Sequence, residues 1–125
     1  MKKIFYILVA TLVLISCHGA KKAMQKGQYD VAINKAVVKL QKKPNDPEHL
    51  QVLELSFLKV VEQDNRKIEF LKKEGRPDNW DNINAVYIKM NNRQEKVSKL
   101  MNIPHGIEFK NYSPDIIASK ERAAE

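Results

Sequence analysis

The alternation of apolar and polar residues predicts helices along most of the chain. Apolar residues recur every three or four positions at about residues 19–26, 29–42, 47–73 and 79–101. This spacing places side chains on one face of an α-helix. Only residues 107–110 alternate weakly, as a strand would. We therefore expect an all-α fold.

Start and stop signals separate these helices. Asp46 followed by Pro47 is typical of a helix start, and Asp78 and Ser113 are further candidate N-caps. Gly75 stands where a left-handed residue often ends a helix. Because the third and fourth helices are long and joined by a short turn, we expect them to pack as an antiparallel αα-hairpin.

One apolar stripe on the fourth helix is expected to face the third helix. Its members are Trp80, Ile83, Tyr87, Met90, Gln94, Val97 and Met101. Asp64 interrupts the matching stripe of the third helix, which predicts a kink, a splayed end or a polar contact there. Gln94 is the polar residue expected opposite Asp64.

Residues 104–125 are predicted to form a loop and the start of a further helix. This helix begins near Ser113 and reaches Glu125 without a glycine, a proline or a capping signal. The pattern indicates a helix that is incomplete, so we expect the chain to be a truncated form of a longer protein.

The first seventeen residues have the layout of a secretory signal peptide. Two lysines precede the apolar stretch Ile4 to Ile15, and Ser16 and Cys17 follow. The stretch is shorter than the about 20 residues that span a membrane. It is apolar on all sides, which argues against a buried amphipathic helix. Ordinary cleavage would favour a small residue where Leu14 stands.

Residues 14–17, Leu-Ile-Ser-Cys, resemble a bacterial lipoprotein box. In that family the cysteine is lipidated, the chain is cut before it, and the new amino terminus is acylated. The resemblance implies a signal peptide over residues 1–16 and lipid on Cys17. His18 follows Cys17 where a retained inner-membrane lipoprotein has Asp, and no acidic export cluster follows. The resemblance therefore implies the periplasmic leaflet of the outer membrane.

A second resemblance concerns the first two predicted helices. The residues that carry it are Gly27, Tyr29, Ala32, Ile33, Ala36, Leu40 and Pro44, which are similar to the second half of a tetratricopeptide repeat. It implies a tetratricopeptide-like helix pair within a helical domain over residues 17–103. The longer third and fourth helices depart from that family. The sequence of residues 70–80 adds a resemblance to a class of Bacteroidota outer-membrane lipoproteins. That class has no established activity, so the resemblance implies none.

The charge of the chain is concentrated near the anchor. Without Lys2 and Lys3 the net charge falls from +7 to +5, with 20 basic and 15 acidic residues. Lys21, Lys22 and Lys26 are the basic residues closest to the predicted membrane. They are either a solvated helix face or a surface attracted to anionic head groups. Nucleic acid is not an expected partner, since no recognition motif occurs.

The residues that could support catalysis or metal binding are scattered. His18, His49 and His105 have no metal-ligand partners at suitable spacing, and we expect them at the surface. No catalytic or phosphate-binding motif is present. The sequence therefore predicts no enzyme activity, no cofactor, no metal and no small-molecule substrate.

The predicted function is that of a non-catalytic, membrane-anchored helical scaffold that binds another protein of the bacterial cell envelope. Any exposed part of Tyr29, Phe57 or Tyr87 is a candidate contact for this partner, which the sequence does not identify. The alternative is attachment to anionic lipid or to the cell wall through the lysine-rich first helices.

Overall fold

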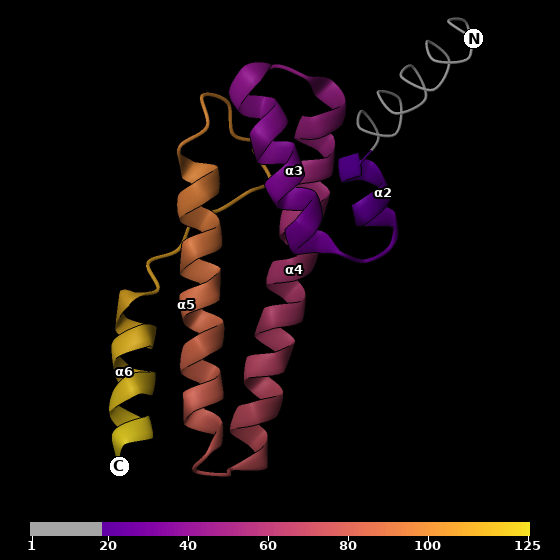
Figure 1. Ribbon diagram of the computed structural model, residues 1–125. Helices are drawn as coiled ribbons and strands as arrows, with labels where there is room; N and C mark the ends of the chain where they lie inside the picture. The colour runs from indigo at the N-terminus through magenta and orange to yellow at the C-terminus, as the bar shows by residue number, and fades with distance from the viewer. Residues whose placement is uncertain (1–18) are drawn as a thin grey trace, which may run out of the picture.

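The computed structural model describes residues 19–125, and within this range it contains five helices and no strands. The expected all-α fold is confirmed (Figure 1). The predicted signal peptide and Cys17 lie outside the described residues. The helices are α2 (Gly19–Gln25), α3 (Tyr29–Lys42), α4 (Pro47–Glu74), α5 (Asn79–Ser98) and α6 (Ser113–Ala124).

The boundaries of α4 follow its capping residues. At its start, the Asp46 carboxylate accepts a hydrogen bond from the backbone N–H of His49 at 3.1 Å. At its end, Gly75 has a φ of +67°, a backbone conformation that is unfavourable for residues with a side chain. The helix continues without a break through Asp64, so that residue makes a polar contact instead of a kink.

Two capping predictions and one helix end differ from the structure. Asp78 precedes α5 without a side-chain capping bond, and Ser113 is the first helical residue of α6 instead of its N-cap. The end of α5 is Ser98, not residue 101, because the chain turns there to bury Leu100. The weakly alternating residues 107–110 form a loop.

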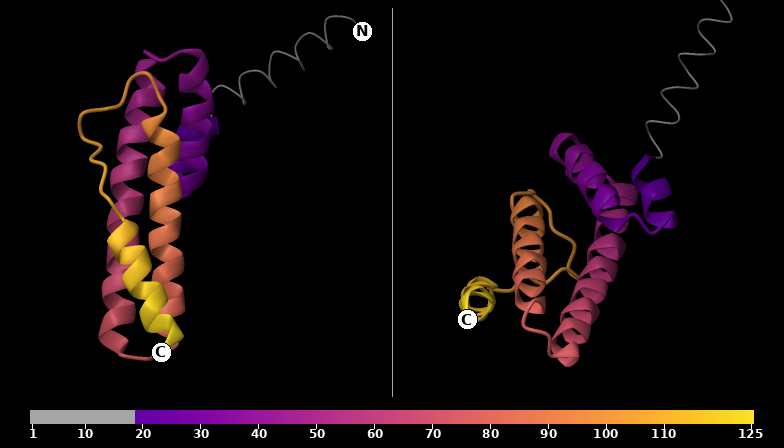
Figure 2. Two further views of the ribbon diagram at one scale, coloured as in Figure 1. Left: turned by 90° about the vertical axis from the view of Figure 1, so that its left-hand side faces the viewer. Right: turned by 60° about the horizontal axis from the view of Figure 1, so that its bottom comes forward.

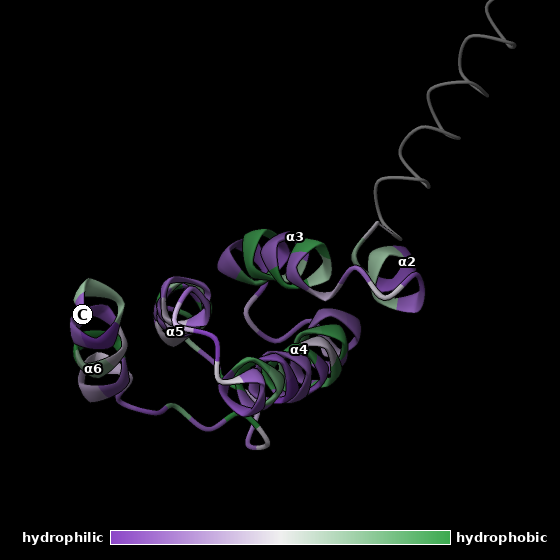
Figure 3. Cartoon of the chain, turned by 90° about the horizontal axis from the view of Figure 1, so that it is seen from below, coloured by the Kyte–Doolittle hydropathy of each residue, from purple (hydrophilic) through white to green (hydrophobic). Residues whose placement is uncertain are grey.

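The helix α4 is the central helix, and it contacts α2, α3 and α5. α2 and α3 pack on its N-terminal half, and α5 returns antiparallel to it from the turn at Gly75 (Figure 1). Residues 99–112 cross back over α4, and α6 then lies along α5 (Figure 2). Seen from below, α6 lies on the far side of α5 from α3 (Figure 3).

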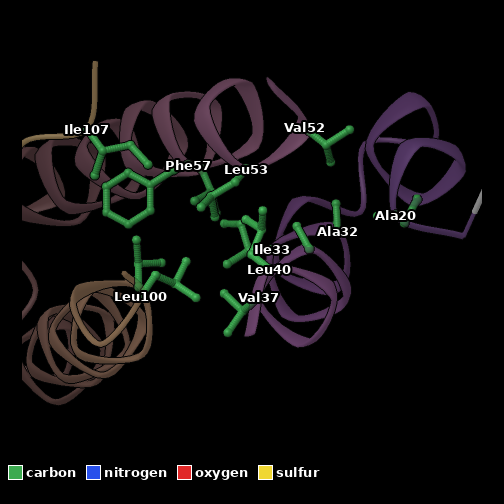
Figure 4. Close-up of a cluster of buried hydrophobic side chains, with 14 residues drawn as sticks. Ala20, Ala32, Ile33, Val37, Leu40, Val52, Leu53, Phe57, Leu100 and Ile107 are labelled. Carbon is green, nitrogen blue, oxygen red and sulfur yellow. The ribbon is translucent and has the colours of Figure 1, made fainter. Parts of the chain in front are cut away.

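The first hydrophobic core lies between α2, α3, α4, the end of α5 and the segment that follows α5 (Figure 4). Ala32, Ala36 and Ser56 are fully buried, and their small side chains let α3 approach α4 closely. Phe57 packs edge-on against Phe109 of the crossing segment, with ring centroids 6.4 Å apart. The larger members of this core are Ile33, Val37, Leu40, Val52, Leu53, Phe57, Val60, Val97, Leu100 and Ile107.

The second core lies lower on the hairpin and joins α4, α5 and α6. Its buried members are Ile68, Ile83, Val86, Met90 and Tyr112. Val61 is the partly buried residue that packs against both cores. The two cores are therefore contiguous only through a narrow region in the middle of α4.

The α5 helix has a buried stripe and a neighbouring half-buried stripe instead of the single predicted one. Asn79, Ile83, Val86, Met90, Arg93 and Val97 are its buried residues. A neighbouring stripe meets α6 and the chain that leads to it: the Asn84 amide donates to Ile116 O, and Gln94 exchanges hydrogen bonds with the Lys110 backbone. Met101 is 83% exposed and belongs to neither stripe. The expected single seam was wrong because α5 packs against two partners.

Candidate partner-binding groove between α4, α5 and α6

An open groove of about 350 Å³ lies where α4, α5 and α6 meet. Trp80 and Tyr87, seven residues apart on α5, both line it and are half-buried. The remaining lining residues are Lys72 from α4 and Asp115, Ala118, Ser119 and Arg122 from α6. We call this the α4–α6 groove.

Two cations lie close to its aromatic rings. The Arg122 guanidinium carbon is 4.7 Å from the centroid of the Trp80 ring. The Lys72 Nζ is 5.9 Å from the Tyr87 ring centroid and donates to the Tyr87 hydroxyl at 3.4 Å. Among residues 19–125, no carboxylate lies within 4.0 Å of either cation. The groove thus combines apolar ring surface with two cations that form no ion pair within 4.0 Å, and with one carboxylate, Asp115.

Hydrogen bonds from α5 hold α6 in place beside the groove. Asn84 Nδ2 donates to Ile116 O at 2.9 Å and to Ser119 Oγ at 3.1 Å. Ser119 is 1% exposed, and its hydroxyl donates to Asp115 O at 2.7 Å. Above these contacts, the Tyr112 ring lies 6.3 Å from the Tyr87 ring, and burial raises the pKa of Tyr112.

A larger depression of about 740 Å³ lies at the other end of α4, beside residues 102–105. It is lined by Pro47, Leu50, Ile103 and Pro104, with Gln51, Glu54, Asn102 and His105 as its polar residues. No phenylalanine, tyrosine or tryptophan and no lysine or arginine lines it. The α4–α6 groove has the more specific chemistry, although it is smaller.

A charged cluster occupies the narrow region between the two cores. Arg93 of α5 donates to Asp64 of α4 at 2.7 Å through Nη2, and to Asp30 of α3 at 2.7 Å through Nε. Lys89 Nζ lies 3.3 Å from Asp30 at the rim. Arg93 is 5% exposed, and its Nη1 has no hydrogen-bond partner among the described residues. The cluster joins three helices, but one buried donor stays unsatisfied.

The pKa values of Asp30 and Arg93 are shifted within this cluster. Burial alone would raise the pKa of Asp30, but hydrogen bonds and positive charge from Arg93, with a further contribution from Lys89, lower it below its ordinary value. Burial alone would lower the pKa of Arg93, whereas its bonds to the two carboxylates raise it. Both shifts favour the charged forms of Asp30 and Arg93.

The predicted partner-binding residues lie in three different environments. Tyr87 lines the α4–α6 groove. Tyr29 is half-buried and packs against the first core. Phe57 is 3% exposed and is a core residue, so the prediction that it contacts a partner was wrong. Its position on the buried stripe of α4 leaves no side-chain surface for a partner.

His49 and the basic residues near the predicted anchor also have defined positions. Lys21, Lys22 and Lys26 are exposed on α2, as expected. His49 was expected at the surface but is 9% exposed, because its ring contacts the Asp46 carboxylate at the start of α4. The hydrogen bond from His49 lowers the pKa of Asp46.

Sequence reasoning placed Trp80 in the hairpin seam and did not identify Lys72 or Arg122 as site residues. Trp80 and Tyr87 are seven residues apart, a spacing that also fits a second face of α5. That face was not recognised, because its contacts come from α6, which is distant in sequence.

The described residues 19–125 contain no group of three or more His, Cys, Asp or Glu side chains that could hold a metal ion. In the same range, no helix has both the length and the apolar character needed to cross a membrane. No protein-family model matches the chain, and no match was found among curated proteins or solved structures.

Proposed function

We propose that this protein is a non-catalytic helical scaffold of the bacterial cell envelope, anchored to the outer membrane by lipid on Cys17 and facing the periplasm. The lipoprotein box at residues 14–17 supports the anchor. A tetratricopeptide-like α2–α3 pair is part of this proposal. It is supported by Gly27, whose φ is +76°, and by the full burial of Ala32 and Ala36.

The α4–α6 groove is the proposed partner-binding site, and its ligand is an acidic peptide segment of an envelope protein. Aromatic side chains and arginine contribute disproportionately to protein interfaces. Here Trp80 and Tyr87 supply the apolar surface, and Lys72 and Arg122 supply positive charge that no carboxylate within 4.0 Å neutralises. This combination is the observation that carries the proposal. It favours a segment with Asp or Glu on either side of one aliphatic or aromatic residue.

Trp80 provides a direct test, because it is the only tryptophan in the chain. Synthetic peptides with acidic residues flanking one leucine or phenylalanine are added to the protein, and Trp80 emission is recorded. We expect a saturable change that weakens with salt. Control peptides of the same length, with lysine in place of the acidic residues, should produce no change in Trp80 emission.

Two charge-reversal variants control for general electrostatics. Lys72→Glu with Arg122→Glu should abolish the response. The control variant combines Lys67→Glu and Lys120→Glu and should preserve the response. Lys67 and Lys120 are exposed on the same two helices but do not line the groove. Equal loss in both variants, or no emission change with any acidic peptide, contradicts this site.

A further inference from the structure

The net positive charge of residues 19–125 lies in the segment formed by α2, α3 and Lys43. Residues 19–43 contain seven lysines and one carboxylate, Asp30, whereas residues 44–125 contain 13 basic and 14 acidic residues. The first segment therefore has a net charge of +6 and the second of −1, which together make the +5 of residues 19–125. Asp30 is itself bonded to Arg93 of α5, so it neutralises a cation outside the segment.

The seven lysines of α2, α3 and the residue after α3 have no acidic partners. None has a carboxylate within 4.0 Å among residues 19–125, whereas Lys59, Arg66 and Lys89 each have one and Arg93 has two. All but Lys39, which is half-buried, are exposed. A surface of this kind attracts an anionic partner at a distance set by the salt concentration.

Three of these lysines form a stripe along α3, and one end of this stripe lies beside Gly19. Lys35 Nζ is 3.2 Å from the position that a Cβ at Gly19 would occupy, so its ammonium lies directly against Gly19. Lys39 and Lys42 follow at the fourth and seventh positions after Lys35, on the same side of α3. We call Lys35, Lys39 and Lys42 the lysine stripe.

The stripe lies next to the point at which the chain leads to Cys17. Cys17 precedes Gly19 by two residues, and two residues of extended chain span at most about 7 Å. The Lys35 ammonium therefore lies within about 10 Å of the Cys17 backbone, and so close to a membrane that holds lipid on Cys17. No other anionic surface is held so close to the stripe by covalent attachment.

We propose that the lysine stripe binds the phosphate groups of anionic phospholipids in the membrane that holds Cys17. This inference rests on the proposed anchor and adds a second contact with the membrane. Each lysine close to an anionic bilayer raises the binding constant for that bilayer about fivefold. Together with the lipid anchor, the stripe fixes the side of α3 that faces the bilayer.

The test uses the lipidated chain, isolated in detergent and reconstituted into vesicles. One set contains phosphatidylcholine alone, and the other contains equal parts of phosphatidylcholine and phosphatidylglycerol. A water-soluble amine-acylating reagent is added, and mass spectrometry measures the labelling rate of each lysine. We expect the lysine stripe to be labelled several-fold more slowly in the anionic vesicles, and high salt to remove this difference. Lys67, Lys73 and Lys120 serve as controls, with equal rates in both.

A matched pair of variants separates position from total charge. Lys35→Gln, Lys39→Gln and Lys42→Gln are combined in one protein, and Lys67→Gln, Lys73→Gln and Lys120→Gln in the other, so each loses three positive charges. In the native chain Lys21 and Lys22 of α2, which are close in sequence to Cys17, should also be labelled more slowly in anionic vesicles. We expect only the first variant to lose this difference. Loss in both variants contradicts a role for the stripe.

The outcomes distinguish the anchor from the lipid contact. A chain that carries no lipid, or leaves both kinds of vesicle, contradicts the anchor and this inference with it. A chain that remains bound but is labelled equally in both contradicts the lipid contact alone. If a soluble acidic peptide or an anionic cell-wall glycan protects the stripe in neutral vesicles as strongly as phosphatidylglycerol does, the partner is not lipid and the inference is overturned.

Discussion

Arg93 of α5 bonds Asp64 of α4 at 2.7 Å, at the level where the two hydrophobic cores meet. Along α4, Asp64 stands between Val60 of the first core and Ile68 of the second. Arg93 has the corresponding position on α5, between Met90 and Val97. The ion pair therefore fixes the register of the hairpin, since a shift of either helix would bury these charges against apolar side chains.

Replacement of Arg93 by methionine should strongly destabilise the fold. Asp64 would remain buried without its cation, and removal of one partner of a buried ion pair costs about 3–5 kcal/mol. The free energy of unfolding, measured by urea denaturation, tests this prediction. Arg66→Met is the control, because Arg66 pairs with Glu62 at an exposed site and should change stability by less than about 1 kcal/mol. A double variant with Asp64→Leu and Arg93→Met should recover most of the loss, and a double variant no more stable than the single one would contradict this account.

Acidification should weaken the same cluster through Asp30. Its pKa lies below the ordinary value of 3.8 in the folded protein, so the unfolded chain binds the proton more readily. The stabilisation is therefore complete well above pH 3.8 and is lost as the pH falls through the folded pKa. Urea denaturation between about pH 5 and pH 3 should show a steeper decline for the native protein than for Asp30→Asn. Parallel pH profiles for the two proteins would show that Asp30 contributes nothing to the decline.

Phe57→Ala and Leu58→Ala should differ sharply, although the residues are adjacent. Phe57 is 3% exposed in the first core, and loss of its ring should cost about 3–5 kcal/mol. Leu58 is 46% exposed, and its truncation should stay within about 0.5 kcal/mol. Thermal or urea unfolding measures both changes. A stable Phe57→Ala protein would restore Phe57 as a candidate surface residue.

Asn84→Ala should loosen α6 specifically. The change removes the donor to Ile116 O and Ser119 Oγ, and a lost buried hydrogen bond costs about 1–3 kcal/mol. Amide hydrogen exchange should accelerate in α6 more than in α3. Asn92→Ala is the control, because Asn92 is exposed on the same helix. If exchange accelerates uniformly, α6 is not held separately by Asn84.

Local signals in the sequence were sufficient to place the helices. Asp46, Pro47 and Gly75 determine the ends of α4 through hydrogen bonding and backbone conformation, which depend on near neighbours. The apolar residues Leu53, Phe57, Val60 and Ile68, which recur at helical spacing along α4, are buried. The polar contact expected at Asp64 is also present.

Tertiary contacts explain what the pattern did not reveal. Asn84 and Gln94 are polar and were assigned to no second interface, yet they bind the chain that returns after α5. Arg93, not Gln94, lies opposite Asp64. An arginine on a helix is indistinguishable from a solvated residue until its partners are known, and both partners come from other helices. The groove was missed for the same reason, because α6 supplies Arg122.

The length of α4 has a mechanical consequence. Its 28 residues correspond to about 42 Å of continuous helix. Val52 shares a core with Ala20 of α2, and Lys72 borders the groove, so about 30 Å of rod lies between them. With the anchor and the groove as proposed, α4 acts as an arm that holds a captured protein about 30 Å from the anchored end of the domain.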